Sequence, residues 1–196
     1  MSNILNFPTP VKFVYGGRNF GDFVDTPISD ASYMYLKTNT KIIRISADLS
    51  LCTNMSHMFD SSEVKFVEGL NTQSCSNMSY IFYNCGSLLS LQQLDCGNVN
   101  DMRYFFRSDN IAIPLSEFGG FKDLGKQPEV KGLDYLGFLE VTYLTHESLM
   151  NVINNLYDRK SNGLPTLAIR FGPTHLDKLT DDEITIAINK GWTLVG

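Results

Sequence analysis

Three stretches of the sequence share one pattern: Cys52-Thr-Asn-Met-Ser-His-Met-Phe59, Cys75-Ser-Asn-Met-Ser-Tyr-Ile-Phe82 and Val99-Asn-Asp-Met-Arg-Tyr-Phe-Phe106. Their methionines and final phenylalanines recur at steps of 23 and then 24 residues, with similar polar residues between them. Self-similarity at a fixed period of this length predicts a repeat architecture, in which each repeat is one structural unit.

A short apolar run precedes the first stretch, and a polar turn followed by another such run comes after each stretch. These runs start at steps of 23 or 24 residues and are Lys41–Ile45, Val64–Val67, Leu88–Leu91 and Ile111–Ile113. Brief apolar runs bounded by turn residues predict short buried strands. Stacking the repeats would place these strands side by side, about 4.8 Å apart, in a parallel sheet.

The recurring methionines and phenylalanines are expected to form columns inside this stack. A coil of this size cannot bury its own apolar face, so equivalent side chains of successive coils pile onto one another. We interpret the residues as core rather than as a metal site or an oxidation sensor. The predicted structural columns are Met55, Met78 and Met102, and Phe59, Phe82 and Phe106.

Beyond residue 125 the Met and Phe pattern disappears, but strand-like runs continue at residues 138–142, 166–171 and 192–195. Two helices are expected to fill the longer coils. Thr145 is the predicted N-cap of the first helix. The second begins with a capping box, Thr180-Asp-Asp-Glu183. The last strand, which starts with Trp192, is expected to cover the open end of the sheet.

Two regions depart from the repeat. Residues 1–38 are irregular, with a possible strand at 11–15, and are interpreted as an N-terminal cap or attachment arm. Residues 119–137 contain several glycines and are interpreted as a loop where the coil type changes. The predicted stack covers residues 39–196, with Met/Phe coils at 39–118 and helix-bearing coils at 133–196.

The repeat Asn-Met-Ser-x-Met-Phe, with a turn such as Cys85-Gly-Ser-Leu88, resembles the BspA-type leucine-rich repeats. Residues 144–158, 179–183 and 189–194 are similar to a terminal module that accompanies these repeats in proteins of gut bacteria and their tailed phages. The resemblance covers about residues 39–196. It implies an α/β, leucine-rich-repeat-like right-handed solenoid, with short parallel strands, irregular return segments and two helices in the C-terminal coils.

The resemblance also implies a class of function. BspA-type proteins are surface proteins whose usual role is adhesion, and the family defines no catalytic residues. Three clear repeats and the lack of a secretory signal at the first residues favour a virion component, which reaches the outside by assembly and lysis. The leading interpretation is a non-enzymatic tail, fibre or head-decoration protein of a phage of gut Bacteroidota.

Such a protein would be located in the virion. Its partners would be other virion proteins, or a protein or glycan of the host surface. A bacterial cell-surface adhesin and a cytoplasmic protein-binding scaffold remain alternatives, and a homo-oligomer is left open.

Composition narrows the chemistry further. A net charge of −5 without a cluster of Lys and Arg argues against nucleic acid as a partner. No apolar run approaches the roughly 18 residues of a membrane span. No catalytic motif, cofactor motif or Cys-x-x-Cys zinc pair occurs, so neither a metal nor a cofactor is expected. Reduced, buried thiols are predicted for Cys52, Cys75, Cys85 and Cys96.

One column is a candidate binding site. His57, Tyr80 and Tyr104 each follow the repeat methionine by two residues. Because Met and Phe take the inward positions, we expect these rings to point outward. Their faces could then stack on a glycan or a protein surface. The alternative is a purely structural ladder that covers the return side of the coils.

Overall fold

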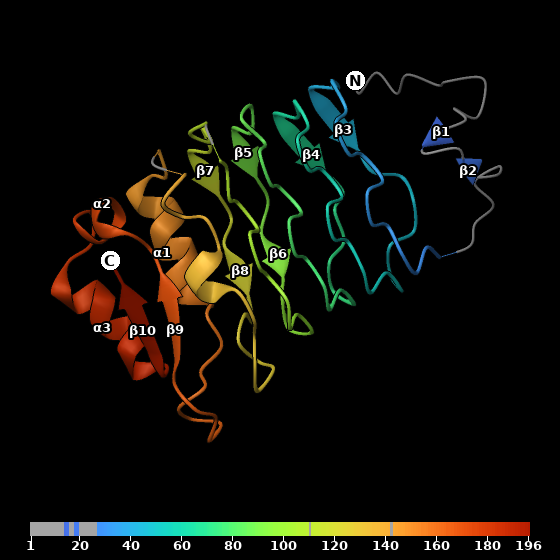
Figure 1. Cartoon of the computed structure of the whole chain (residues 1–196). Coiled ribbons are helices and arrows are strands. Elements are labelled where there is room, and N and C mark those ends of the chain that lie inside the picture. The colour runs from blue at the N-terminus through green and yellow to red at the C-terminus, as the bar shows by residue number, and fades with distance from the viewer. Residues whose placement is uncertain (1–13, 16–17, 20–26, 110, 142) are drawn as a thin grey trace, which may run out of the picture.

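The computed structural model describes residues 14–15, 18–19, 27–109, 111–141 and 143–196. This part of the chain has a mixed α/β fold with short parallel strands and three α-helices (Figure 1). Strands β1 (Val14–Tyr15) and β2 (Arg18–Asn19) form an antiparallel pair. The rest of the N-terminal cap expected before residue 27, and residues 11–13 of the expected strand, lie outside the described residues.

A four-stranded parallel sheet runs along the first half of the chain. In β3 and β4 the middle residue is buried and its neighbours are exposed, the alternation of a half-buried strand. Residues paired across the sheet lie 24, 24 and then 27 positions apart, so each coil brings the chain back beside the previous one. The strands, in spatial order, are β3 (Ile42–Arg44), β4 (Phe66–Glu68), β5 (Ser90–Leu91) and β7 (Glu117–Phe118).

The fourth strand is not where the sequence pattern placed it. The prediction of a strand at Ile111–Ile113 is wrong, because the strand that pairs with β5 is β7, Glu117–Phe118. The connection after the third repeat is longer than its predecessors, and Pro114 follows the apolar run directly. Proline has no N–H to donate within a central strand, so pairing starts only beyond it.

A second, smaller parallel sheet pairs β6 (Leu94–Asp95) with β8 (Phe121–Lys122). Residues 119–137 therefore hold a strand and a 3-10 helix, η1 (Leu133–Tyr135), where a loop was expected. A Cβ at Gly119 would lie 2.3 Å from the backbone nitrogen of Gln93. This glycine thus permits close packing of two backbones rather than marking a loop.

The return segments are also paired, through a row of parallel bridges that joins Asp30, Asn54, Asn77, Asp101 and Lys131 in turn. The row begins one repeat earlier than the sequence pattern indicated. The boundary expected at residue 38 therefore falls inside paired backbone, eight residues after the first bridge.

The recurring apolar side chains fill the space between the strands and the return segments. All six residues of the Met and Phe columns are fully buried. The rings of Phe59 and Phe82 stack with centroids 5.1 Å apart and planes 2° from parallel. The four cysteines are free and buried, as predicted.

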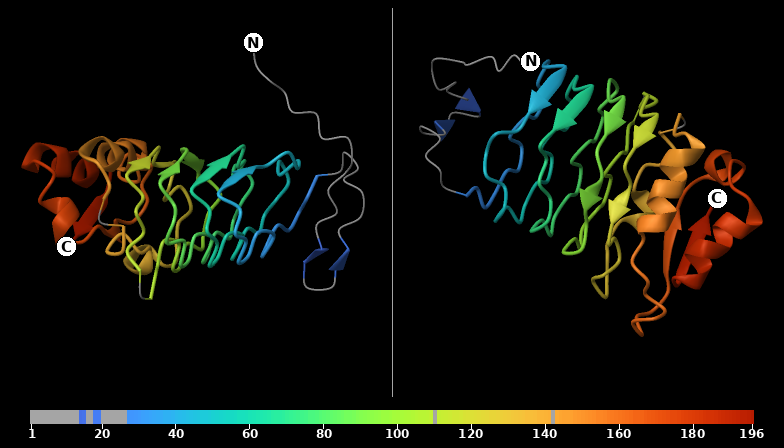
Figure 2. Two further views of the ribbon diagram at one scale, coloured as in Figure 1. Left: turned by 90° about the horizontal axis from the view of Figure 1, so that it is seen from above. Right: turned by 180° about the vertical axis from the view of Figure 1, so that it is seen from behind.

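The C-terminal coils carry helices at one end of the stack, far from β3 in both views of Figure 2. Thr145 accepts a hydrogen bond from Ser148 N at 3.2 Å, and the capping box of Thr180 and Glu183 is complete, so both predicted helix starts are confirmed. The elements are α1 (His146–Asn155), β9 (Leu167–Arg170), α2 (Pro173–Leu176), α3 (Asp181–Asn189) and β10 (Trp192–Val195), with β9 and β10 paired in parallel.

Two predictions for this region are wrong. A third helix, α2, was not expected; Gly172, at φ +82°, and Pro173 at the first helical position start it. The predicted strand at 138–142 is not a strand in its described residues 138–141. Phe138 lies 5.9 Å from the ring of Phe106, so this apolar run continues the buried Phe column on the return side.

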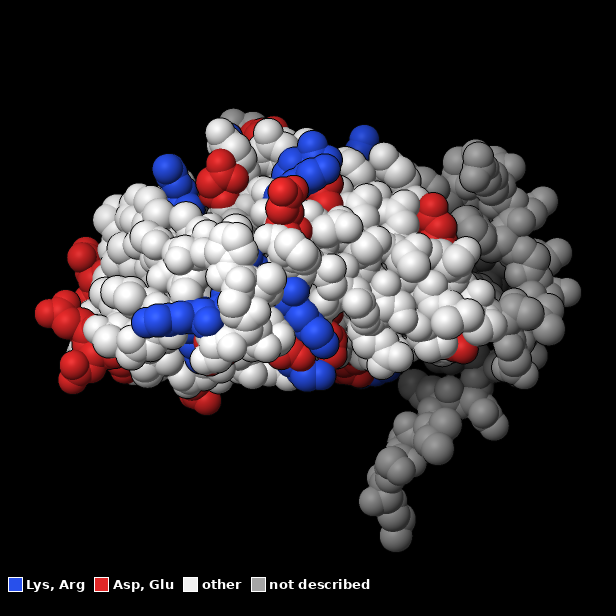
Figure 3. All heavy atoms as spheres, turned by 90° about the horizontal axis from the view of Figure 1, so that it is seen from below, with Lys and Arg blue, Asp and Glu red and all other residues white. Residues whose placement is uncertain are grey.

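Charge is unevenly distributed along the molecule. Figure 3 looks onto the lower edge of Figure 1. The first coils are largely uncharged there, and charged side chains gather toward the C-terminal half. The connecting segments 69–76 and 96–100 contain no charged residue. On this edge Lys and Arg are interspersed with Asp and Glu.

Candidate functional site

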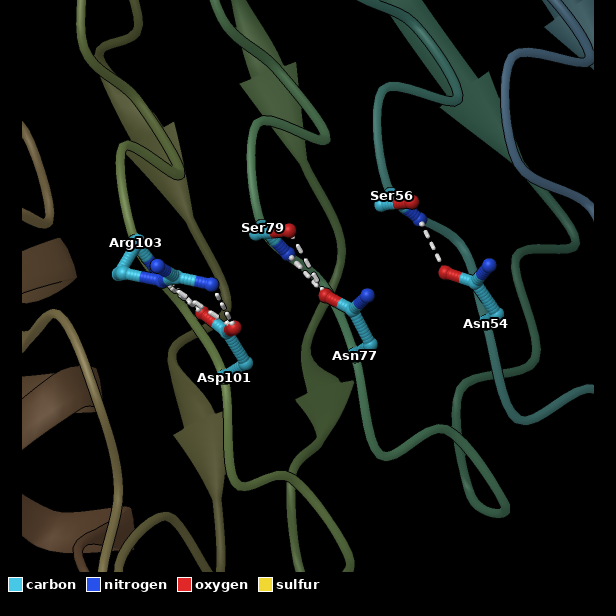
Figure 4. Close-up of polar contacts among 6 residues, drawn as sticks. All are labelled: Asn54, Ser56, Asn77, Ser79, Asp101 and Arg103. Carbon is cyan, nitrogen blue, oxygen red and sulfur yellow. Dashed lines mark hydrogen bonds and ion pairs between the residues drawn. The ribbon is translucent and has the colours of Figure 1, made fainter.

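The return segments carry a repeated turn, shown for three coils in Figure 4. In each coil an Asn or Asp side-chain oxygen accepts a hydrogen bond from the backbone N–H two residues further on. This local bond is the Asx turn, which Asn and Asp favour because their short side chains reach their own backbone. The bonded pairs are Asn54 with Ser56, Asn77 with Ser79 and Asp101 with Arg103, at 3.1, 3.0 and 3.1 Å.

The next residue after each turn has a left-handed backbone. The φ angles of His57, Tyr80 and Tyr104 are 57°, 58° and 59°. Residues with a Cβ rarely adopt this conformation, and it persists where the surroundings fix it. Here the backbone N–H of each residue is bonded to the next coil, as from His57 to Ser79 O at 3.0 Å. The three side chains lie at the surface with intermediate exposure.

The rings of these three residues form one continuous stack. The centroids of His57 and Tyr80 are 4.4 Å apart, and those of Tyr80 and Tyr104 are 4.8 Å apart. Two further tyrosines extend the stack, Tyr33 beside His57 at 4.8 Å and Tyr135 beside Tyr104 at 5.9 Å. We call these five side chains the aromatic ladder.

The sequence pattern missed both ends of the ladder. Tyr33 belongs to the segment Asp30-Ala-Ser-Tyr-Met-Tyr35, which matches the repeat 24 residues before Asn54-Met-Ser-His-Met-Phe59. The spacing was therefore a usable signal, masked because alanine replaces methionine. Tyr135 follows Tyr104 by 31 residues and lies in η1, so no sequence period indicates it.

The ladder does not present its faces in the way that the sequence suggested. His57 is sandwiched between Tyr33 and Tyr80, with planes within 9° of parallel. A ligand cannot stack on a face that a neighbouring ring already covers, so the inner rings offer only edges and polar atoms. Tyr33 and Tyr135, at the two ends, are the most open rings of the ladder, 43% and 52% exposed.

A hollow of about 280 Å³ lies beside the C-terminal half of the ladder. The hydroxyl of Tyr83 donates a hydrogen bond to Asp109 there, which raises the pKa of Tyr83 to about 12. The phenol therefore stays protonated at physiological pH. The residues that line the hollow are Tyr80, Tyr83, Tyr104, Tyr135, Arg107 and Asp109.

The histidines have polar partners elsewhere. Nδ1 of His57 lies 2.7 Å from a carboxylate oxygen of Asp60. The ring of His146 contacts Glu183 at 2.8 Å. His175 is fully buried, with Nδ1 2.8 Å from the carbonyl oxygen of Phe171, and burial lowers its pKa.

The thiols and carboxylates form no evident site of chemistry. Burial raises the pKa of Cys75 and Cys85 to about 12, so these thiols stay protonated. The acids at the start of α3 belong to a capped helix N-terminus. In the described part of the chain, no three His, Cys, Asp or Glu side chains are grouped to hold a metal ion.

Comparison with known proteins identifies the family. Residues 19–118, just over half of the chain, match the family described as Mycoplasma protein of unknown function, DUF285, and the chain belongs to this family. The family is related to the BspA-like repeat families, which confirms that part of the resemblance. The match ends at residue 118, so the likeness of the C-terminal coils to phage modules stays a prediction.

No curated protein and no solved structure matches the chain. Among the helices of the described residues, none is long and apolar enough to cross a membrane.

Proposed function

We propose that this chain is a non-enzymatic binding module, built as a leucine-rich-repeat-like right-handed solenoid that presents side chains at fixed intervals. The observation that carries the proposal is the aromatic ladder. Five rings from five coils lie at the surface and are held by left-handed backbone and Asx turns. The buried repeat residues are accounted for by packing, whereas packing of the core does not require aromatic side chains at these surface positions.

We further propose that the module works in the virion of a tailed phage, as a tail, fibre or head-decoration component. The support is the likeness of residues 144–194 to terminal modules of proteins of such phages. Its partners would then be other virion proteins or a protein or glycan of the host surface.

Mass spectrometry of purified virions tests this assignment. The protein should be present in stoichiometric amounts with known structural proteins and should resist washing from the particle. Its absence from the particles would rule out the virion role.

The binding role of the ladder is tested separately with the double variant Tyr80→Ala, Tyr104→Ala. We expect binding to host cells to fall strongly while the circular dichroism spectrum is retained. Tyr143→Ala is the matched control, because Tyr143 is 61% exposed and lies outside the ladder. Unchanged binding by the folded double variant would leave the ladder a purely structural feature.

A second candidate is a bacterial cell-surface adhesin, favoured by the match to a family described from Mycoplasma. Genes for portal, capsid and tail proteins beside this gene would support the virion role. Surface labelling of bacterial cells with an antibody to the protein would support the adhesin. Detection in the cytoplasmic fraction alone would favour the third alternative, an intracellular scaffold.

A further inference from the structure

The C-terminal end of the aromatic ladder lies between two adjoining hollows. The first is the hollow of about 280 Å³ beside the ladder. The second, of about 100 Å³, is lined by Tyr135, Arg107, Asp134, Leu139, Glu140 and Arg170, among others. Tyr135 and Arg107 line both hollows, so a ligand could occupy the two together.

Tyr135 offers the open ring of this region. It is half exposed, and its centroid lies 5.9 Å from that of Tyr104 with planes 32° apart, whereas His57 and Tyr80 are 4.4 Å apart and almost parallel. The ladder thus ends in a tyrosine with one ring neighbour in the described structure. Leu139, also about half exposed, lines the same hollow and adds apolar surface.

The guanidinium groups of this region are incompletely satisfied. Arg107 Nε lies 3.4 Å from Glu140 Oε1, an ion pair without hydrogen-bond geometry. Arg107 Nε and Glu140 Oε2 are buried and have no hydrogen-bond partner in the described structure. Arg170 lines the smaller hollow, and no ion pair joins it to any described residue. Buried polar atoms without partners are unusual and point to a ligand or water that completes them.

We propose that these two hollows form a binding site for an acidic saccharide, a pyranose ring that bears a carboxylate. This inference rests on the proposed binding function and names its ligand class. A sugar ring has apolar C–H faces that pack against a tyrosine, here Tyr135. The planar fork of an arginine such as Arg170 or Arg107 matches a carboxylate with two parallel hydrogen bonds.

The acidic side chains of the site explain why the ligand is a saccharide with a single charge. Asp109, Asp134 and Glu140 accept hydrogen bonds from sugar hydroxyl groups. The same carboxylates repel a polyanion, so a nucleic-acid strand is disfavoured. The larger hollow is close to the lower end of the ~300–1,000 Å³ typical of small-molecule sites, which suits a short saccharide.

The test is a binding titration of the full chain with matched probes. Tetragalacturonate, a hyaluronan tetrasaccharide and 3′-sialyllactose are each compared with their carboxyl-reduced forms, which keep the rings and hydroxyls and lose the charge. We expect at least one acidic probe to bind, and its reduced form to bind about tenfold or more weakly, as loss of a charged hydrogen bond predicts.

Arg170→Met and Tyr135→Ala should each weaken binding of that probe by about tenfold. Both side chains are exposed, so folding should be retained. Arg44→Met is the matched control: Arg44 lies on β3, and its side chain is 71% exposed. Binding by this variant should be unchanged.

Three outcomes would overturn the site. These are no binding of any acidic probe, equal binding of acidic and reduced forms, and acid-selective binding that Arg170→Met leaves intact. The proposed function fails on different evidence, because loss of the protein from virions and cell surfaces leaves these titrations unaffected. Host-cell binding that persists when no probe binds would remove only the saccharide site.

Discussion

The two halves of this chain are held together in different ways. In the Met/Phe coils the same contacts recur in every repeat: a buried Met, a stacked Phe, an Asx turn and a row of backbone bridges. In the helix-bearing coils the contacts are single. The fully buried guanidinium of Arg159 donates to four carbonyl oxygens, those of Gly125, Gln127, Pro128 and Pro165.

This difference separates distributed from concentrated stability. A stack of like coils is stabilised by many similar neighbour contacts, so each contributes a part of a repeated sum. The C-terminal end cannot repeat, because it must cover the last coil. It therefore relies on contacts that occur once, among them Trp192, whose indole N–H donates to Tyr157 O at 3.0 Å. Since Trp192 is the single tryptophan, its fluorescence reports this end of the molecule.

The largest effect is expected from the repeated core. Phe82→Ala removes a fully buried ring that stacks between Phe59 and Phe106. We expect the free energy of unfolding to fall by about 3–5 kcal/mol. Urea unfolding followed by circular dichroism measures this. Phe66→Ala, on the outer face of the sheet, is the control and should cost far less. Equal losses would mean that the Phe column is not the core of the repeat.

The second prediction concerns the single contacts of the C-terminal end. A Cβ at Gly125, where φ is +86°, would lie 2.3 Å from the ring of Trp192. We expect Gly125→Ala to lower the free energy of unfolding by about 2–4 kcal/mol, from backbone strain and overpacking. Tryptophan fluorescence should report the loss at lower urea than circular dichroism does.

Gly163→Ala provides the matched control for this substitution. Gly163 has φ +67°, but nothing lies within 4 Å of its Cβ position. Its cost should be about 1 kcal/mol, from backbone strain alone. Equal costs at the two sites would contradict the tight packing of Trp192 on Gly125.

The third prediction uses pH. His175 is buried and its folded-state pKa is lowered, so the unfolded chain binds a proton more readily than the folded one. Its contribution to stability is complete above the unfolded pKa of about 6.5 and falls as the pH decreases below it. The slope cannot exceed about 1.4 kcal/mol per pH unit for one group.

Urea midpoints of the wild type and of His175→Gln, measured between pH 7.5 and 5, test this dependence. The wild type should lose stability over this range, and the variant should lose less. Parallel curves would show that His175 does not titrate on unfolding.

The smallest effect is expected at the repeated turn. Asn77 accepts hydrogen bonds from the N–H and the hydroxyl of Ser79. Asn77→Ala should cost about 1 kcal/mol in urea unfolding. Asn77→Asp keeps the acceptor, as Asp30 and Asp101 do at the equivalent positions, and should cost little. Were the aspartate variant to lose as much as the alanine variant, the Asx turn would not be the stabilising element.

Prediction from sequence succeeded where a local rule decides the structure. Helix starts at Thr145 and Thr180 follow from side chains that bond to their own backbone. The stacking of His57, Tyr80 and Tyr104 follows from the period. Prediction failed where coil length changed: an apolar run at Ile111–Ile113 has the composition of a strand, but the backbone partner lies at Glu117–Phe118.

For the candidate site, the sequence indicated the aromatic column but not the surroundings that give it chemistry. Arg107, Asp109, Tyr135 and Arg170 come from different coils with no common spacing, and only the stacking of the coils brings them together. Likewise, nothing in the sequence indicates that the buried guanidinium of Arg159 bonds to carbonyls rather than to a carboxylate.

The sequence by itself determined the period, the buried Met and Phe columns and the outward position of the aromatic rings. These depend on residues that recur at one coil length and on which side of each coil is apolar. The tertiary structure alone decided that the inner rings cover one another's faces and that the open ring is Tyr135. The distance between rings depends on how closely successive coils stack and how their planes tilt, which no single coil encodes.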